Sequence, residues 1–115
     1  MTSTPRFLQA VRGFVGEGLD EYLPLTPPLT YVVPPDRSAQ CVYFRGGNSS
    51  DELLCIVLTR DGQPMRLFPI GARGSVHIPL RIVEDLLTDT ELEIHVAAPS
   101  GCAGTVVIDL GLLEL

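Results

Sequence analysis

Residues 53–70 read LLCIVLTRDGQPMRLFPI and predict a β-hairpin. The run LLCIVL is apolar throughout and rich in β-branched side chains, a pattern that suits a central strand buried on both faces. Asp61-Gly62 between two apolar runs is a strong signal for a two-residue hairpin turn. Pro64 and Pro69 each lack a backbone N–H, so we expect the second strand to lie at the edge of its sheet. The two expected strands are 53–60 and 64–70.

Outside this hairpin, apolar and polar residues alternate with the period of two that indicates β-strands. In strand 91–97, Leu92, Ile94 and Val96 are expected to face the core and the residues between them to face outward. Further strands are expected at 31–33, 40–45, 75–80 and 105–115, the last with a bulge at Gly111, and residues 81–87 are expected to form a short helix or turn. About seven strands separated by frequent turns are typical of a mainly β fold, an antiparallel β-sandwich; a closed barrel is the alternative.

Residues 5–22 predict an N-terminal helical arm instead of a strand. Phe7, Val11 and Val15 recur at helical spacing, with Phe14 beside them. The glycines in this segment weaken an isolated helix, so the arm must dock on its own sheet or on a neighbouring subunit. Phe7, Val11, Phe14 and Val15 are therefore the expected interface residues.

The sequence LPLTPPL that follows predicts an extended, proline-rich linker. The expected domain organisation is an arm and linker over residues 1–29 and a β-sandwich over residues 30–115.

The composition is unusually apolar for a chain of this size. The 115 residues are 45% hydrophobic and 19% charged, whereas soluble domains average about 25% charged residues. The apolar surplus favours an interface between copies of the chain, with another protein as a further partner. The alternative is a compact β core with a sparsely charged surface.

The charge pattern excludes several classes of partner. The net charge is −6, there is no lysine, and the eight arginines are scattered, so nucleic acid is not expected as a partner. No apolar run is long enough to span a membrane as a helix. The three cysteines form no disulfide framework, so we expect a cytoplasmic protein. Cys41 and Cys55 are expected to be buried and inert, and Cys102 to react.

No motif in the sequence specifies a reaction. The candidates for a ligand pocket are His77, Glu93, His95 and Arg66, the residues that strand pairing could bring together. They lack the spacing of a metal site, and neither a metal nor a cofactor is expected.

The loop of residues 46–52 resembles no known ligand-binding motif. Gly46-Gly47-Asn48 lacks the lysine and helix of a phosphate-binding loop, and the oxygen-bearing side chains from Asn48 to Glu52 lack EF-hand spacing. We therefore expect a non-catalytic interaction or assembly module that forms a homo-oligomer. The alternatives are an accessory subunit or small-ligand-binding β-sandwich, and a small enzyme without a recognisable motif.

Overall fold

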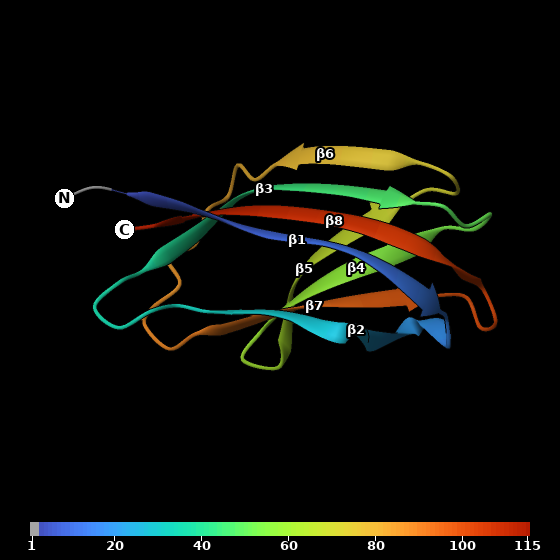
Figure 1. The fold of residues 1–115 in the computed structure, drawn as a ribbon, viewed down its shortest axis with the longest axis horizontal. Helices are drawn as coiled ribbons and strands as arrows, with labels where there is room; N and C mark the ends of the chain where they lie inside the picture. The colour runs from blue at the N-terminus through green and yellow to red at the C-terminus, as the bar shows by residue number, and fades with distance from the viewer. Residues whose placement is uncertain (1–2) are drawn as a thin grey trace.

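The computed structural model describes residues 3–115 and consists of two four-stranded antiparallel sheets (Figure 1). Sheet A has the strand order β1-β8-β3-β6, and sheet B has the order β2-β7-β4-β5. The strands are β1 (Thr4–Val15), β2 (Gly18–Val32), β3 (Ala39–Asn48), β4 (Leu54–Arg60), β5 (Gln63–Ile70), β6 (Ser75–Pro79), β7 (Glu91–Ala98) and β8 (Ala103–Glu114). The expectation of a mainly β fold with two antiparallel sheets is confirmed.

The core lies between the two sheets and follows the alternation of the strands. Leu92, Ile94 and Val96 of β7 are buried, as the sequence pattern predicts. Phe44 of β3 stacks on Phe68 of β5 with their ring centroids 4.1 Å apart, so the aromatic pair links sheet A to sheet B. Such a stacked pair stabilises the fold beyond the area that it buries.

The expected hairpin at residues 53–70 is present. β4 pairs with β5 in antiparallel register, with Arg60 opposite Gln63. Asp61 and Gly62 both have positive φ, 50° and 83°, as a type I′ turn requires. β5 is the last strand of sheet B, so its predicted edge position is confirmed.

The prediction of an N-terminal helical arm is wrong. Residues 4–15 form β1, which pairs along its whole length with β8, and the chain then turns through Gly16 and Gly18 into β2. Phe7, Val11 and Val15 are spaced by four residues, and four is both near one helical turn and a multiple of the strand period. Their spacing alone therefore could not separate the two structures, and pairing with β8 decides for the strand.

The proline-rich stretch is a strand and not a linker. It lies inside β2, which runs across the expected boundary between residues 29 and 30 and pairs with β7. The pairing is irregular, with register shifts between Gly18 and Leu23 and between Pro24 and Leu29. Prolines cannot donate to the ladder, which explains why β2 lies at the edge of sheet B.

Two smaller expectations are refined. Residues 81–87 form no helix, which leaves the turn alternative: residues 81–82 are bends and Leu86 is bridged to Ala39. The irregularity near Gly111 belongs to β3, whose register shifts between Cys41 and Tyr43, while β8 is regular there. Within residues 3–115 there is no helix long and apolar enough to cross a membrane.

Candidate functional site

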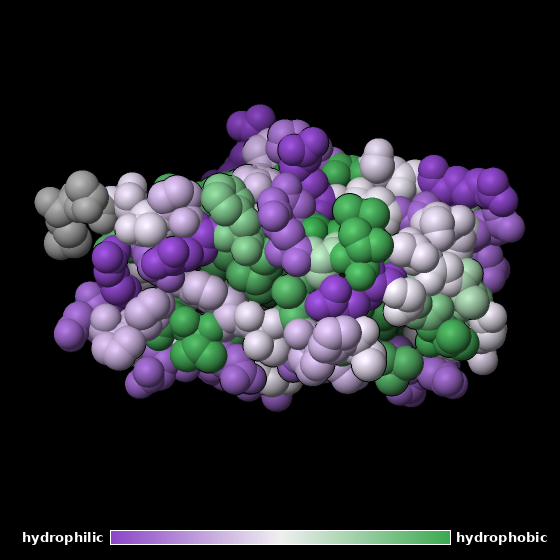
Figure 2. All heavy atoms as spheres, viewed as in Figure 1, coloured by the Kyte–Doolittle hydropathy of each residue, from purple (hydrophilic) through white to green (hydrophobic). Residues whose placement is uncertain are grey.

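Apolar side chains gather on the outer face of sheet A, beside its first strand. We call Phe7, Val11 and Val15 of β1, together with Val107 of β8, the β1 strip. All four are exposed, Val11 to 62%, and Val11 lies directly opposite Val107. Figure 2, in the same view as Figure 1, shows apolar residues among hydrophilic ones on the face crossed by the strands of sheet A. The strip is the kind of surface that marks an interaction site.

The same residues of β1 lie on an open sheet edge. Ser38, next to β3, and Leu115, next to β8, exchange both backbone hydrogen bonds, at 3.2 and 2.8 Å. Successive residues of a strand direct their backbone groups to opposite sides, so the odd-numbered residues of β8 form hydrogen bonds with β3 and the even-numbered residues with β1. Each even-numbered residue of β1 lies opposite an even-numbered residue of β8, as Leu8 does with Leu110, so the even-numbered residues of β1 form the hydrogen bonds to β8. The odd-numbered residues, which include Phe7, Val11 and Val15, therefore direct their N–H and C=O groups away from the sheet.

Prolines or short length protect the other three sheet edges of residues 3–115, whereas the edge of β1 is covered only at Arg12, whose guanidinium donates to the carbonyls of Val11 and Pro27, each at 3.1 Å. Prolines interrupt β2 and β5, and β6 is only 5 residues long and ends on Pro79. β1 has 12 residues, pairs without a register shift, and carries proline only at Pro5, near its start. Long unprotected edges are templates for pairing, and proteins usually block them. Among the edge strands of residues 3–115, β1 is thus the one that offers a long, regular edge.

A polar row crosses the middle of the outer face of sheet A. Gln9, Asp109, Arg45 and His77 are register neighbours on β1, β8, β3 and β6. Asp109 accepts hydrogen bonds from Tyr43 Oη at 3.0 Å and from Gln9 Nε2 at 3.3 Å. Burial, together with the hydrogen bond to Asp109, raises the pKa of Tyr43 above its usual value. The neutral phenol therefore stays in place as a donor on this face.

An open groove of about 740 Å³ lies over Gly47 beside this row. Its lining includes Arg45, His77 and Asp109, with Val107 at the side nearest β1. Because Gly47 has no side chain, the floor of the groove is backbone, and the polar side chains stand around it. The groove offers a cation, a carboxylate and an imidazole to a small polar molecule.

One of the expected interface residues is not available. Phe14 is 8% exposed and belongs to the core, because even-numbered residues of β1 face sheet B. Phe7, Val11 and Val15 face outward, as an interface requires. Val107 was not among the residues expected at an interface, since only the pairing of β1 with β8 shows that it lies beside Val11.

The four candidate pocket residues do not converge. His77 lies on β6 of sheet A, whereas Glu93 and His95 lie on β7 of sheet B. Arg66 is opposite the core residue Leu58, on the other face of sheet B, and its guanidinium pairs with Glu84 at 2.9 Å. Only Glu93 and His95 are neighbours, with Oε1 and Nε2 3.7 Å apart. The four candidates therefore do not form one pocket.

The imidazole of His95 lies on the outer face of sheet B and is mostly buried, with 12% of the side chain exposed. The ring of Tyr22 meets it edge-on, with the centroids 5.1 Å apart. Within the described residues, its Nδ1 is buried and has no hydrogen-bond partner. Among residues 3–115, no group of three or more histidine, cysteine or acidic side chains has the arrangement of a metal site.

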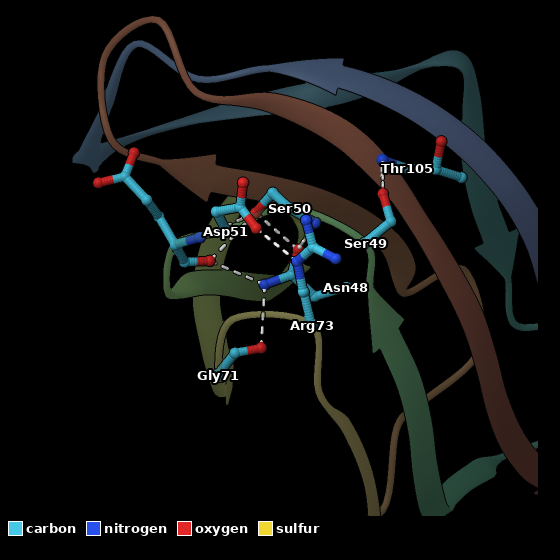
Figure 3. Close-up of polar contacts among 8 residues, drawn as sticks. Asn48, Ser49, Ser50, Asp51, Gly71, Arg73 and Thr105 are labelled. Atoms are coloured by element: carbon cyan, nitrogen blue, oxygen red, sulfur yellow. Dashed lines mark hydrogen bonds and ion pairs between the residues drawn. The ribbon is translucent and has the colours of Figure 1, made fainter.

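The loop after β3 is held by Asn48 (Figure 3). The buried amide of Asn48 donates to the carbonyls of Glu52, Ile70 and Gly71 at 2.9–3.2 Å. Its Oδ1 accepts from the N–H and the hydroxyl of Ser50. The hydrogen-bonding capacity of Asn48 is therefore used within the fold, which gives this residue a structural role.

The three cysteines are free and differ in exposure. Cys41 is buried, as expected, and burial raises the pKa of its thiol to about 12. Cys55 is only half-buried, on the outer face of sheet B, and burial raises its pKa as well. Cys102 is half-buried in the turn before β8.

A buried carboxylate connects the two sheets near the end of the chain. Glu114 of β8 accepts from the hydroxyl of Tyr31 in β2 at 2.5 Å and pairs with Arg6 of β1 at 3.2 Å. The hydrogen bond from Tyr31 is the main cause that lowers the pKa of Glu114, and Arg6 adds to it. Burial, followed by the contact with Glu114, raises the pKa of Tyr31.

Comparison with known proteins gives no relative that defines a family. No family model and no curated protein matches the sequence. Among solved structures, the chain is similar to the crystal structure of exo-β-1,3-galactanase from Phanerochaete chrysosporium with galactose, with a TM-score of 0.43 and 14% identity. The match covers 100% of this chain and 30% of the galactanase chain. Similarity at this level assigns neither a family nor a function.

Proposed function

We propose that this chain is a non-catalytic interaction module that assembles into a homo-oligomer through the β1 side of sheet A. The observation that carries the proposal is the coincidence of the β1 strip with the one sheet edge of residues 3–115 that neither prolines along the strand nor short length protects. An exposed apolar strip favours burial against a partner. An open edge supplies backbone donors and acceptors to the same partner.

The distribution of charge supports self-association at this position. The chain carries a net charge of −6, so two copies repel each other over most of their surfaces. β1 contains no acidic residue, and its only charged residues are Arg6 and Arg12. The β1 side is therefore a place where two acidic molecules can approach with little repulsion.

Light scattering across a range of protein concentrations tests the proposal. We expect a mass above 12.4 kDa that rises with concentration. The double variant Phe7→Ser/Val15→Ser should shift the mass toward that of the monomer. Leu67→Ser is the matched control, because Leu67 is 63% exposed on β5, in the other sheet, and lies outside the β1 strip. A mass of 12.4 kDa at every concentration would exclude the proposal.

The groove over Gly47 supports a second candidate, a small-ligand-binding accessory module. Arg45 lines the groove and, among residues 3–115, makes no salt bridge within 4.0 Å, so its charge is free for a ligand. Titration with acetate and with glucose, followed by NMR, distinguishes an anionic from a neutral polar ligand. Saturable shifts at Gly47 and His77 that are lost in Arg45→Gln would favour this function, and their absence with both probes would count against it.

A reducing compartment such as the cytoplasm suits this module. The support is that all three cysteines are free, one of them buried. Disulfides are common in exported domains of this size and rare in the cytosol.

A further inference from the structure

The open edge of β1 is complementary to itself in one register. Building on the proposed self-association, we infer that two copies pair antiparallel along β1, with the two-fold axis at Val11. Each odd-numbered residue then lies opposite an odd-numbered residue of the second copy. The opposed pairs are Val11 with Val11, Gln9 with Gly13, and Phe7 with Val15.

The backbone groups needed for this ladder are exposed. Phe7, Gln9, Val11, Gly13 and Val15 are all exposed, and each directs one N–H and one C=O away from β8. Residues with this orientation exchange both hydrogen bonds when they lie directly opposite each other. The Val11 carbonyl already accepts from Arg12 Nη1 at 3.1 Å, which confirms that it faces outward. The same guanidinium donates from Nε to the Pro27 carbonyl of β2 at 3.1 Å, so pairing at Val11 requires the Arg12 side chain to turn away from the edge.

The side chains favour the axis at Val11. On the outer face, the exposed apolar residues of the β1 strip oppose one another, Phe7 against Val15 and Val11 against itself. On the core side, Leu8 faces Phe14, and Ala10 faces Arg12. No two like charges are directly opposed in this register, and apolar cross-strand pairs each stabilise a sheet by about 0.2–1 kcal/mol.

Neighbouring registers are worse for identifiable reasons. An axis at Gln9 places Arg6 opposite Arg12, and an axis at Arg12 places that residue opposite itself. An axis at Ala10 places Val15 opposite Pro5, which has no N–H to donate. With the axis at Val11, Pro5 falls beyond the end of the opposing β1.

The paired assembly would join the two copies of sheet A into one continuous sheet. Its strand order would be β6-β3-β8-β1-β1-β8-β3-β6. The groove over Gly47 is lined by β8, β3 and β6 and not by β1. Both grooves would therefore stay open on the outer face of the dimer.

Substitutions at Gln9 test the edge pairing. Gln9→Pro removes an N–H that the β1–β8 ladder does not use, while Gln9→Ser keeps the N–H and loses the same side-chain contact with Asp109. We expect Gln9→Ser to dimerise like the wild type and Gln9→Pro to remain monomeric in light scattering, with both variants folded by circular dichroism. If Gln9→Pro does not fold, amide exchange in the wild type replaces it. The N–H groups of Gln9 and Gly13 should then exchange more slowly as concentration rises, and unchanged rates in a dimer would overturn edge pairing.

A charge pair tests the register. Phe7→Lys and Val15→Glu should each weaken dimerisation, and the double variant in one chain should dimerise about tenfold more tightly than the separate effects predict. Positions 7 and 15 are about 27 Å apart within one strand, so this rescue requires contact between copies.

The outcomes separate the two proposals. A wild type that is monomeric at every concentration refutes the proposed function and this inference together. A wild-type dimer with an equally strong Gln9→Pro dimer refutes edge pairing alone. If Gln9→Pro is monomeric but Phe7→Lys and Val15→Glu do not rescue each other, the edge pairing stands and the register is refuted.

Discussion

Replacement of Gly16 by alanine should destabilise the fold, because two backbone segments meet at this residue. A Cβ at Gly16 would lie 2.3 Å from the Pro99 carbonyl oxygen and 2.5 Å from that of Ala98. These obstacles are main-chain atoms that cannot rotate aside. A shift of the backbone that relieves this clash would also weaken two hydrogen bonds of Gly16. They run from its N–H to the Cys102 carbonyl, at 2.7 Å, and from the Gly101 N–H to its carbonyl, at 2.9 Å. Overpacking costs about 1–3 kcal/mol, and a weakened hydrogen bond adds about 1 kcal/mol.

We therefore expect Gly16→Ala to lower the free energy of unfolding by about 3 kcal/mol. Urea denaturation at one fixed protein concentration measures the change. Gly71→Ala is the matched control, since a Cβ there would have no heavy atom within 4 Å and Gly71 lies outside the β1 edge. That variant should equal the wild type or exceed it by about 0.5 kcal/mol, because alanine loses less conformational entropy on folding than glycine. Equal urea midpoints for the two variants would refute the close approach at Gly16.

Three further predictions follow from buried polar groups and thiols. Asn48→Ala should cost about 1–3 kcal/mol in urea denaturation, because carbonyls lose their donor, while Arg73→Ala, which removes an exposed ion pair, should cause no measurable change. The folded-state pKa of Glu114 is lowered, so its stabilising contribution is present above the usual glutamate pKa and is lost as the pH falls through the folded-state value. Glu114→Gln should thus be less stable at neutral pH and depend less on pH in the acid range, and parallel acid profiles would contradict this. A thiol reagent should label native Cys102 well before Cys41, whose pKa is raised to about 12 by burial, and equal rates would contradict the burial of Cys41.

The sequence determined the β-sandwich wherever local signals agreed with one another. Asp61-Gly62 predicted a hairpin, because Asp-Gly readily adopts the positive φ angles of a type I′ turn, which joins two strands through two residues. Leu92, Ile94 and Val96 were assigned to the core from alternation alone, and all three are buried. Pro64 and Pro69 placed β5 at an edge, because a proline cannot donate to a second neighbour.

The N-terminal strands show where local signals were insufficient. Residues spaced by four share a face in a helix and in a strand, so Phe7, Val11 and Val15 fitted both. Gly16 and Gly18 were interpreted as weak points of a helix, yet they form the turn between β1 and β2. Gly18 has a φ of 135°, which favours glycine. In the sequence, the glycines at positions 16 and 18 indicated a turn, and the β-branched valines before them favoured a strand; these were the available signs of two strands.

The candidate site depended on tertiary structure. The sequence identified Phe7, Val11 and Val15 as residues for an interface, because exposed apolar side chains need cover. It could not show that β1 pairs with β8, since strand pairing joins residues about a hundred positions apart, as in Leu8 with Leu110. That pairing leaves the other side of β1 without a neighbour and places Val107 beside Val11. β1, unlike β5 with its prolines, carries no local pattern that marks an edge strand, so its edge position is decided by the assembled sheet.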